Sequence, residues 1–335
     1  MNTNLEQNSS NKRSQRSNST VRDYGVLGTL IGLFITLAFC SDAFLTRVNL
    51  GNIASQSAPI GILACGATIV IISGGFDLSA GGIYAICGVI AAEVANSTTP
   101  LLGLLAGVVA GLIIGIANGI VITILRINPF IATLATGLLL RGIATVITNG
   151  ALIRVDDDSF EFLSNSRIFG LKFSVYIFAF VALLASFMLT RTRLGRYIHA
   201  VGGNSEASRL SGIRVDGIRI TAFALSGVLA GLAGVVATSR VATGQADVAI
   251  GIELIAIAAV IVGGSSPAGG KGAIWRSIVG VFLLSLIANG FNLININPFY
   301  LPIVQGLIIL FAVGSDSWSQ GNIQLHRVKF TKTKT

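Results

Sequence analysis

The chain has 335 residues, of which 53% are hydrophobic and only 11% charged, and its mean hydropathy is +0.80. Soluble domains carry about 25% charged residues, so this composition excludes an ordinary soluble protein. The net charge of +9 does not indicate nucleic-acid binding. No basic run is interleaved with aromatic residues. The lysines and arginines are concentrated in particular loops and tails rather than on one positive face.

Apolar runs of roughly membrane-spanning length recur along the chain. We predict an all-α polytopic membrane protein, with about ten transmembrane helices in a single transmembrane domain over 23–315. Residues 1–22, rich in Asn and Ser, are predicted to form a disordered cytoplasmic tail, and residues 316–335 a basic cytoplasmic tail. The predicted spans lie near 25–41, 53–73, 80–95, 101–124, 130–148, 173–190, 217–238, 251–264, 273–291 and 299–314.

The positions of the basic residues orient these spans. With both termini in the cytoplasm, the inner loops and tails hold most lysines and arginines. The outer loops hold fewer, namely Arg47, Arg154, Arg167, Lys172 and Arg240. This asymmetry agrees with the positive-inside rule. An acidic cluster over 156–161 falls outside, where water solvates it.

Small residues in the apolar runs are spaced as in the packed helices of membrane proteins. Five glycines recur every four residues on one predicted helix: Gly103, Gly107, Gly111, Gly115 and Gly119. Such a stripe lets two helix backbones approach closely, so we predict a helix–helix contact there. Cys40, Cys65 and Cys87 show no metal-ligand spacing and are predicted to be packing residues, so no metal site is expected.

Two glycine-rich segments, 74–82 and 263–272, interrupt apolar runs and resemble each other, as do the residues that lead into them. Paired breaks of this kind point to a transport pathway, because irregular backbone at membrane depth is tolerated only against protein or water. The alternative is two ordinary cytoplasmic turns.

The longest hydrophilic connection predicted on the cytoplasmic side is 191–216. Within it, residues 204–211 can form a short helix, with Asn204 or Ser205 as its N-cap, Glu206 in its first turn and Gly212 at its end. Its shape suits docking into a groove on a partner. The alternative is an amphipathic loop lying on anionic lipid.

The chain resembles the permeases of bacterial ribose/xylose/galactose-type ABC importers over roughly residues 25–315. Five ordered blocks carry the resemblance: 73–82 (SGGFDLSAGG), 130–142 (FIATLATGLLLRG), 148–150 (TNG), 192–213, and 253–272. Residues 239–250 depart most from the family pattern.

This resemblance implies a division of labour. A cytoplasmic ABC ATPase binds and hydrolyses ATP, two permease subunits form the pathway as a homodimer or a pair of paralogues, and an extracytoplasmic binding protein delivers the sugar. The chain itself has no Gly-x-x-x-x-Gly-Lys-Ser/Thr phosphate loop, so we expect no ATP cofactor and no enzymatic activity of its own. The ATPase-coupling segment implied by the resemblance contains Gly203, Asn204, Glu206, Ala207, Arg209, Leu210, Ser211 and Gly212.

Three charged residues, Asp77, Arg141 and Glu253, fall near or inside the spans. An ionisable residue at membrane depth is costly, so it pairs with another group or lines water. The residues therefore either border the sugar pathway or form a structural ion pair of Arg141 with Asp77 or Glu253. Four asparagines could bond a sugar or another helix: Asn118, Asn149, Asn289 and Asn292.

No catalytic constellation stands out, since the two histidines lie outside the predicted spans and no carboxylate pair has helical spacing within them. An intramembrane enzyme is therefore not expected, and the resemblance implies a monosaccharide permease of the bacterial inner membrane. The alternatives are an ABC permease for a nucleoside, an amino acid or an autoinducer-type cargo, an ion-coupled secondary transporter and, most weakly supported, a lipid-embedded enzyme.

Overall fold

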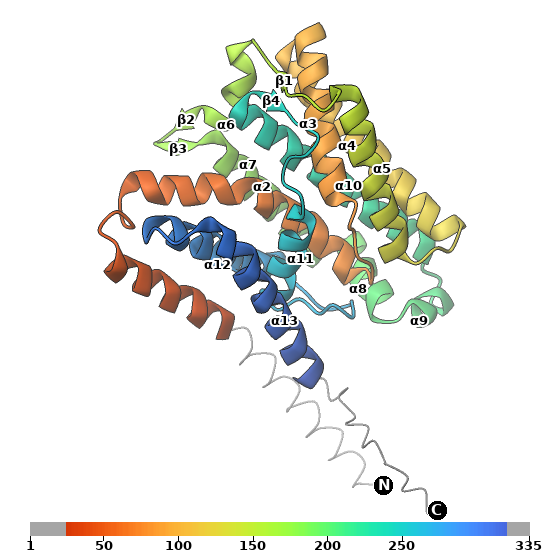
Figure 1. Ribbon diagram of the computed structural model, residues 1–335. Helices are drawn as coiled ribbons and strands as arrows, with labels where there is room; N and C mark the ends of the chain where they lie inside the picture. The colour runs from red at the N-terminus through yellow and green to blue at the C-terminus, as the bar shows by residue number, and fades with distance from the viewer. Residues whose placement is uncertain (1–24, 320–335) are drawn as a thin grey trace, which may run out of the picture.

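The computed structural model describes residues 25–319, which form a helical bundle with two short two-stranded ribbons (Figure 1). The predicted tail over 1–22 lies outside this range, as does all of 316–335 except the last residues of α13. An apolar helix over Gly25–Cys40 comes first. The helices that follow are α2 (Arg47–Ile72), α3 (Ala80–Ser97), α4 (Pro100–Ile124), α5 (Pro129–Thr148), η1 (Asp158–Glu161), α6 (Phe162–Asn165), α7 (Phe173–Arg191), α8 (Arg193–Gly203), α9 (Ser205–Leu210), α10 (Val215–Val241), α11 (Ile252–Val262), α12 (Ile274–Leu293), η2 (Pro298–Tyr300) and α13 (Leu301–Ser319).

Seven of the described helices are long and apolar enough to cross a membrane: α2, α3, α4, α5, α7, α10 and α12. This agrees with a polytopic all-α membrane protein, and every predicted span contains a helix. The span predicted over 251–264 is shorter than expected. Its helix α11 has 11 residues, or about 16 Å, whereas about 20 residues are needed to cross the hydrocarbon core.

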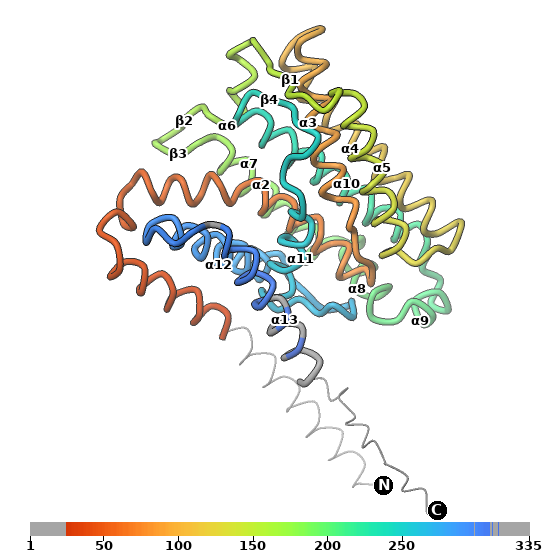
Figure 2. The backbone as a smooth tube through the Cα atoms, in the orientation of Figure 1, coloured from red at the N-terminus to blue at the C-terminus, as the bar shows by residue number. Residues whose placement is uncertain are grey.

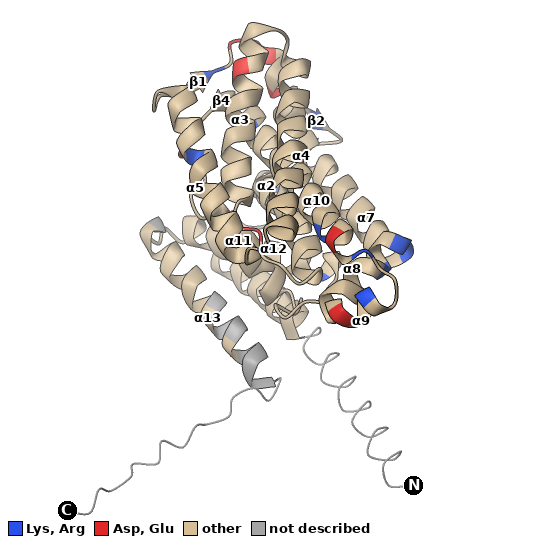
Figure 3. Ribbon diagram, turned by 90° about the vertical axis from the view of Figure 1, so that its right-hand side faces the viewer, with Lys and Arg blue, Asp and Glu red and all other residues tan. Residues whose placement is uncertain are grey.

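Charged residues gather mainly at two opposite ends of the bundle, and the helices between them are mostly uncharged (Figure 3). We call the end that carries α8, α9 and the loop between α11 and α12 the α9 end. The opposite end, which we call the β1 end, carries η1, α6 and the strands β1 (Ile153–Arg154), β2 (Arg167–Ile168), β3 (Leu171–Lys172) and β4 (Thr243–Gly244). Strand β1 pairs with β4 and β2 with β3, both antiparallel.

Helix α2 is the centre of the bundle. It begins at Thr46, whose hydroxyl accepts a hydrogen bond from the Asn49 N–H, and most of its apolar residues are buried. Helices α7, α10, α11 and α12 pack around it. Because α2 is hydrophobic on all sides, it is stable only when other helices surround it.

The predicted glycine stripe on α4 is a helix–helix contact. A Cβ atom added at any of its five glycines would lie closer than 3.0 Å to an atom of α3 or α10, a spacing that real Cβ atoms do not show. At Gly111, for example, it would meet the Gly227 carbonyl of α10. The stripe therefore allows α4 to pack backbone to backbone against both neighbours.

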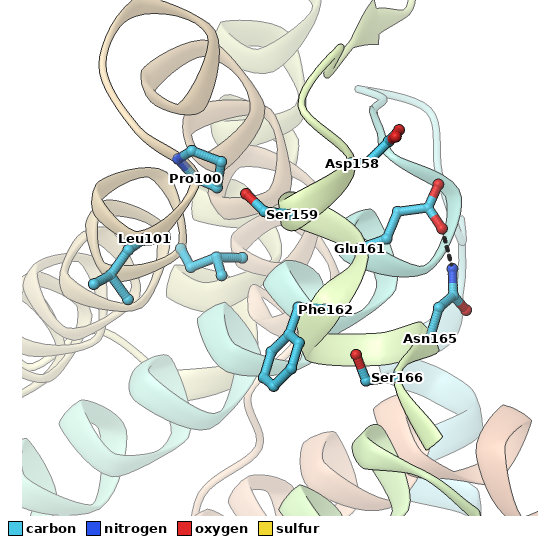
Figure 4. A pocket seen from close by; sticks show the side chains of 9 residues that line it. Pro100, Leu101, Asp158, Ser159, Glu161, Phe162, Asn165 and Ser166 are labelled. Atoms are coloured by element: carbon cyan, nitrogen blue, oxygen red, sulfur yellow. Dashed lines mark hydrogen bonds between the residues drawn. The ribbon is translucent and has the colours of Figure 1, made fainter. Parts of the chain in front are cut away.

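A cavity of about 520 Å³ at the β1 end lies between the start of α4 and the η1–α6 segment (Figure 4). Two acidic residues line it, and one of them, Glu161, accepts a hydrogen bond from the Asn165 amide at 2.7 Å. Nearby Asp157 is exposed, and hydrogen bonds from Ser159 hold the pKa of its carboxyl below the ordinary value. Asp156, Asp157 and Asp158 of the predicted acidic cluster are exposed, whereas Glu161 is half-buried.

Candidate functional site

The predicted short helix over 204–211 is present as α9. The Asn204 side chain caps it by accepting a hydrogen bond from the Ala207 N–H at 2.9 Å, and Glu206 lies in its first turn. Gly212, with a φ of +83°, ends it. The N–H groups of Gly212 and Ile213 donate to the carbonyls of Arg209 and Ser208, which is the Schellman arrangement.

Helix α9 presents most of its surface to solvent. Leu210 is 83% exposed, and Glu206, Ala207, Ser211 and Gly212 are exposed as well. The Arg209 guanidinium lies 3.9 Å from the Asp216 carboxylate, but both side chains are well exposed, and such pairs contribute about 0–1 kcal/mol. An exposed apolar residue flanked by weakly engaged charges leaves this helix free to contact a partner.

Beside the end of α8, three glycine-rich segments meet at the α9 end of the bundle (Figure 2). The Gly270 N–H donates to the Ile72 carbonyl at 2.9 Å. A Cβ added at Gly202, near the end of α8, would overlap the Ile72 carbonyl and lie 2.8 Å from the Gly270 nitrogen. Gly74 and Gly269 have φ values of +88° and +87°, which favour glycine. We call this contact of 72–75, 202–203 and 269–270 the glycine junction.

The glycine junction joins the two breaks that the sequence singled out as similar. Segment 74–82 connects α2 with α3, and segment 263–272 connects α11 with α12. Both touch the end of α8, which leads directly into α9. The end of α8 therefore contacts both breaks directly, through backbone atoms.

Asp77 is buried in a hydrogen-bond network that ties α3, α4 and α10 together. One of its carboxylate oxygens accepts from the N–H and the hydroxyl of Ser79, and the other accepts from the Ser226 hydroxyl at 2.7 Å. The Asn118 amide donates to the Ser79 hydroxyl, also at 2.7 Å. These bonds compensate for burial of the carboxylate, which is only 3% exposed as a residue.

Glu253, not Asp77, is the carboxylate beside Arg141. The two side chains approach to 3.7 Å and are 18% and 17% exposed. Arg141 also donates to the carbonyls of Val248 and Ala249, at 3.3 and 3.5 Å. A Cβ added at Gly81 would collide with the Glu253 carboxylate, so the glycine makes room for this pair.

The carbonyls that Arg141 holds belong to an irregular segment, 245–251, that links β4 to α11. Arg141 lies seven residues before Thr148, the last residue of α5, so it is about 10 Å inside that end of the helix. Segment 245–251 thus enters the bundle from the β1 end and leads into α11. Such backbone needs protein or water around it.

Sequence reasoning missed this arrangement and noted only that 239–250 departs from the family pattern. A signal was present: Gly251 and Glu253 stand at the start of an apolar run that is too short to cross a membrane. For the asparagines, the structure favours bonds between helices. Asn289 and Asn49 exchange two hydrogen bonds, at 2.8 and 3.2 Å, and Asn118 belongs to the Asp77 network.

Residues 49–313 match the model of the family described as branched-chain amino acid transport system / permease component. The Ribose import permease protein RbsC of Escherichia coli (strain K12) is 40% identical over 300 residues, covering 87% of this chain and 94% of that protein. The L-arabinose transport system permease protein AraH of the same strain is 39% identical over 298 residues, covering 89% and 91%.

A relative from another bacterium gives the same result. The Ribose import permease protein RbsC of Bacillus subtilis (strain 168) is 39% identical over 298 residues, covering 87% of this chain and 92% of that protein. The comparison with solved structures finds no match. The matched region contains α9, the glycine junction, the Asp77 network and the Arg141–Glu253 pair. The chain therefore belongs to the family of transport-system permeases that includes the ribose import and L-arabinose transport permeases.

Proposed function

We propose that this chain is the membrane-spanning permease subunit of an ABC importer that carries a monosaccharide across the bacterial inner membrane. The observation that carries the proposal is identity of about 40% to ribose and arabinose permeases along nearly their whole length. Pentoses such as ribose and arabinose, or a similar sugar, are the substrates that follow from these relatives.

Ten spans with both termini in the cytoplasm are the topology that fits this role. The charge distribution supports it, because the predicted inner loops are richer in Lys and Arg than the predicted outer loops. In this orientation the α9 end is cytoplasmic and the β1 end faces outward. Segment 245–251 with α11 then forms one of the ten crossings.

The partners follow from this orientation. A separate cytoplasmic ABC ATPase docks on residues 203–212, and the exposure of α9 supports that assignment. An extracytoplasmic sugar-binding protein docks on the β1 end, and a second permease subunit completes the pathway. ATP binds to the ATPase and not to this chain, whose sequence lacks a phosphate loop.

Transport then couples to ATP hydrolysis through rigid-body movement. Closure of the ATPase displaces α9, and the glycine junction carries that displacement to the α2–α3 and α11–α12 breaks. Asp77 holds the first break to α4 and α10, while Arg141 and Glu253 hold the start of α11 to α5. These groups thus act as fixed points around which the pathway opens.

The test is co-purification with the partner ATPase. We expect wild type to capture the ATPase and stimulate its ATP hydrolysis. A variant with Glu206→Lys and Arg209→Glu should lose at least tenfold in complex yield, because it reverses both charges on the docking helix. The matched control is Arg154→Glu with Asp156→Arg, an exposed pair 3.8 Å apart at the β1 end, which should bind the ATPase as wild type does.

If wild type captures no ATPase but takes up substrate alone when an ion gradient is applied, the chain is a secondary transporter and the proposal is wrong. Amino-acid transport is a second candidate, since the family description names branched-chain amino acids. Competition of labelled ribose uptake by unlabelled pentoses and by leucine distinguishes the two cargoes.

A further inference from the structure

A second cavity, of about 280 Å³, lies within the bundle among α2, α10, α11, α12 and α13. Four polar side chains line it, one from each of four helices: Gln56, Arg240, Ser285 and Gln305. Gln56 lies nine residues into α2 from the β1 end and Ser285 eight residues from the end of α12, so each is about 12–14 Å deep. The cavity therefore occupies the half of the bundle nearer the β1 end.

None of these four side chains makes a hydrogen bond or an ion pair within residues 25–319. Polar groups at membrane depth that lack protein partners are costly unless water or a ligand satisfies them. Elsewhere in the bundle, Asp77 and Asn289 are engaged by short hydrogen bonds, whereas Oε2 of Glu253 has no hydrogen-bond partner among the described residues. Gln56 is exposed and the other three side chains are half-buried, so all four are accessible to hydrogen-bond a polar ligand in the cavity.

We propose that this cavity is a binding subsite for a neutral monosaccharide on the transport route, an inference that rests on the proposed function. Ligand pockets are mostly apolar with a few placed polar groups, and this cavity has that mixture at about the lower end of their size range. The glutamines and the serine both donate and accept, and the arginine donates, which matches sugar hydroxyls. Aliphatic side chains such as Ile60, Ile255 and Leu284 suit the C–H faces of the ring.

The charge of the lining separates the cargo classes. Arg240 is the single charged residue among the described lining residues, and no carboxylate faces it there. A sodium ion would be repelled, and the ammonium group of an amino acid would find no counter-charge. A neutral polyol needs neither, so the lining selects sugars over both alternatives.

Uptake by the complete importer tests the subsite. The permease, ATPase and binding protein are reconstituted in proteoliposomes, and uptake of labelled ribose and arabinose is measured beside ATP hydrolysis. Each of Gln56→Leu, Ser285→Ala and Gln305→Leu removes sugar hydrogen bonds and should lower uptake about fivefold. ATP hydrolysis stimulated by the binding protein should stay within about twofold of wild type, because α9 is untouched. Ser186→Ala on α7, outside the cavity, is the control.

A second readout does not depend on loss of activity. In a chain with Cys40, Cys65 and Cys87 replaced, Ser285→Cys should react with a water-soluble thiol reagent and should be protected by ribose at saturating concentration. Leu183→Cys, on an apolar exposed face of α7, should not react. If wild type imports sugar but Ser285→Cys stays unreactive and the substitutions leave uptake unchanged, the subsite is wrong while the proposed function stands. If wild type imports no monosaccharide, the proposed function itself fails.

Discussion

At the scale of single residues, burial decides which charges matter. Charged pairs at the exposed ends, such as Arg154 with Asp156, are solvated and contribute little. Inside the bundle, Arg141 lies beside one carboxylate and donates to two carbonyls at once. All three contacts are longer than 3.2 Å, so Arg141 holds three groups together without a short bond to any of them.

We predict that Arg141→Met lowers the free energy of unfolding by about 3 kcal/mol, because it leaves the Glu253 carboxylate unpaired inside the bundle. Glu253→Gln should cost less, and the double variant should cost clearly less than the sum of the two single variants. Thermal unfolding in a mild detergent measures all three. Additive effects would show that the two side chains do not stabilise each other.

At the scale of elements, glycine sets how closely segments approach. Gly111 lets α4 lie against the backbone of α10, and Gly202 lets α8 lie against the end of α2. The neighbouring Gly203 differs, because a Cβ there would meet no atom within 4 Å. A methyl group therefore fits at Gly203 but not at Gly202. An alanine at Gly203 can serve as the packing control for an alanine at Gly202.

We predict that Gly202→Ala destabilises the protein by about 1–3 kcal/mol, because the added methyl group must displace the Ile72 carbonyl or the 269–270 backbone. In the assembled importer it should also lower sugar uptake more than ATP hydrolysis. Gly203→Ala should leave stability close to wild type, because its added methyl group meets no atom within 4 Å. Equal effects of the two substitutions on stability would mean that the junction does not pack as described.

At the scale of the whole molecule, the exposed features lie at opposite ends of an apolar bundle (Figure 3). Helix α9 and the glycine junction occupy one end, and the β1–β4 and β2–β3 ribbons occupy the other. The Arg141–Glu253 pair and the polar cavity lie between them. A partner that binds at either end would contact segments that lead into the interior. This arrangement suits a transporter that has partners on both sides of the membrane.

This arrangement predicts the outcome of sided labelling in intact cells. With the three native cysteines replaced, Phe169→Cys, at the tip of the β2–β3 ribbon and 97% exposed, should react with a membrane-impermeant thiol reagent added outside. Leu210→Cys on α9 should react only after the membrane is permeabilised. The reverse pattern would invert the proposed topology and remove α9 from the ATPase.

The sequence by itself determined the class of protein, the helical segments, the glycine seam and the capped helix α9. These features depend on hydrophobic runs, glycine spacing and local capping, all of which act over a few neighbouring residues. The resemblance to sugar permeases, carried by five ordered blocks, was also present in the sequence and was confirmed by the comparisons.

Only the tertiary structure decided which distant residues meet. It chose Glu253 over Asp77 as the neighbour of Arg141, brought the two glycine breaks together at Gly202, and gathered Gln56, Ser285 and Gln305 around one cavity. It also showed that α11 is too short to cross a membrane alone. Local patterns cannot fix such contacts, because they depend on how helices far apart in the chain rotate and pack against one another.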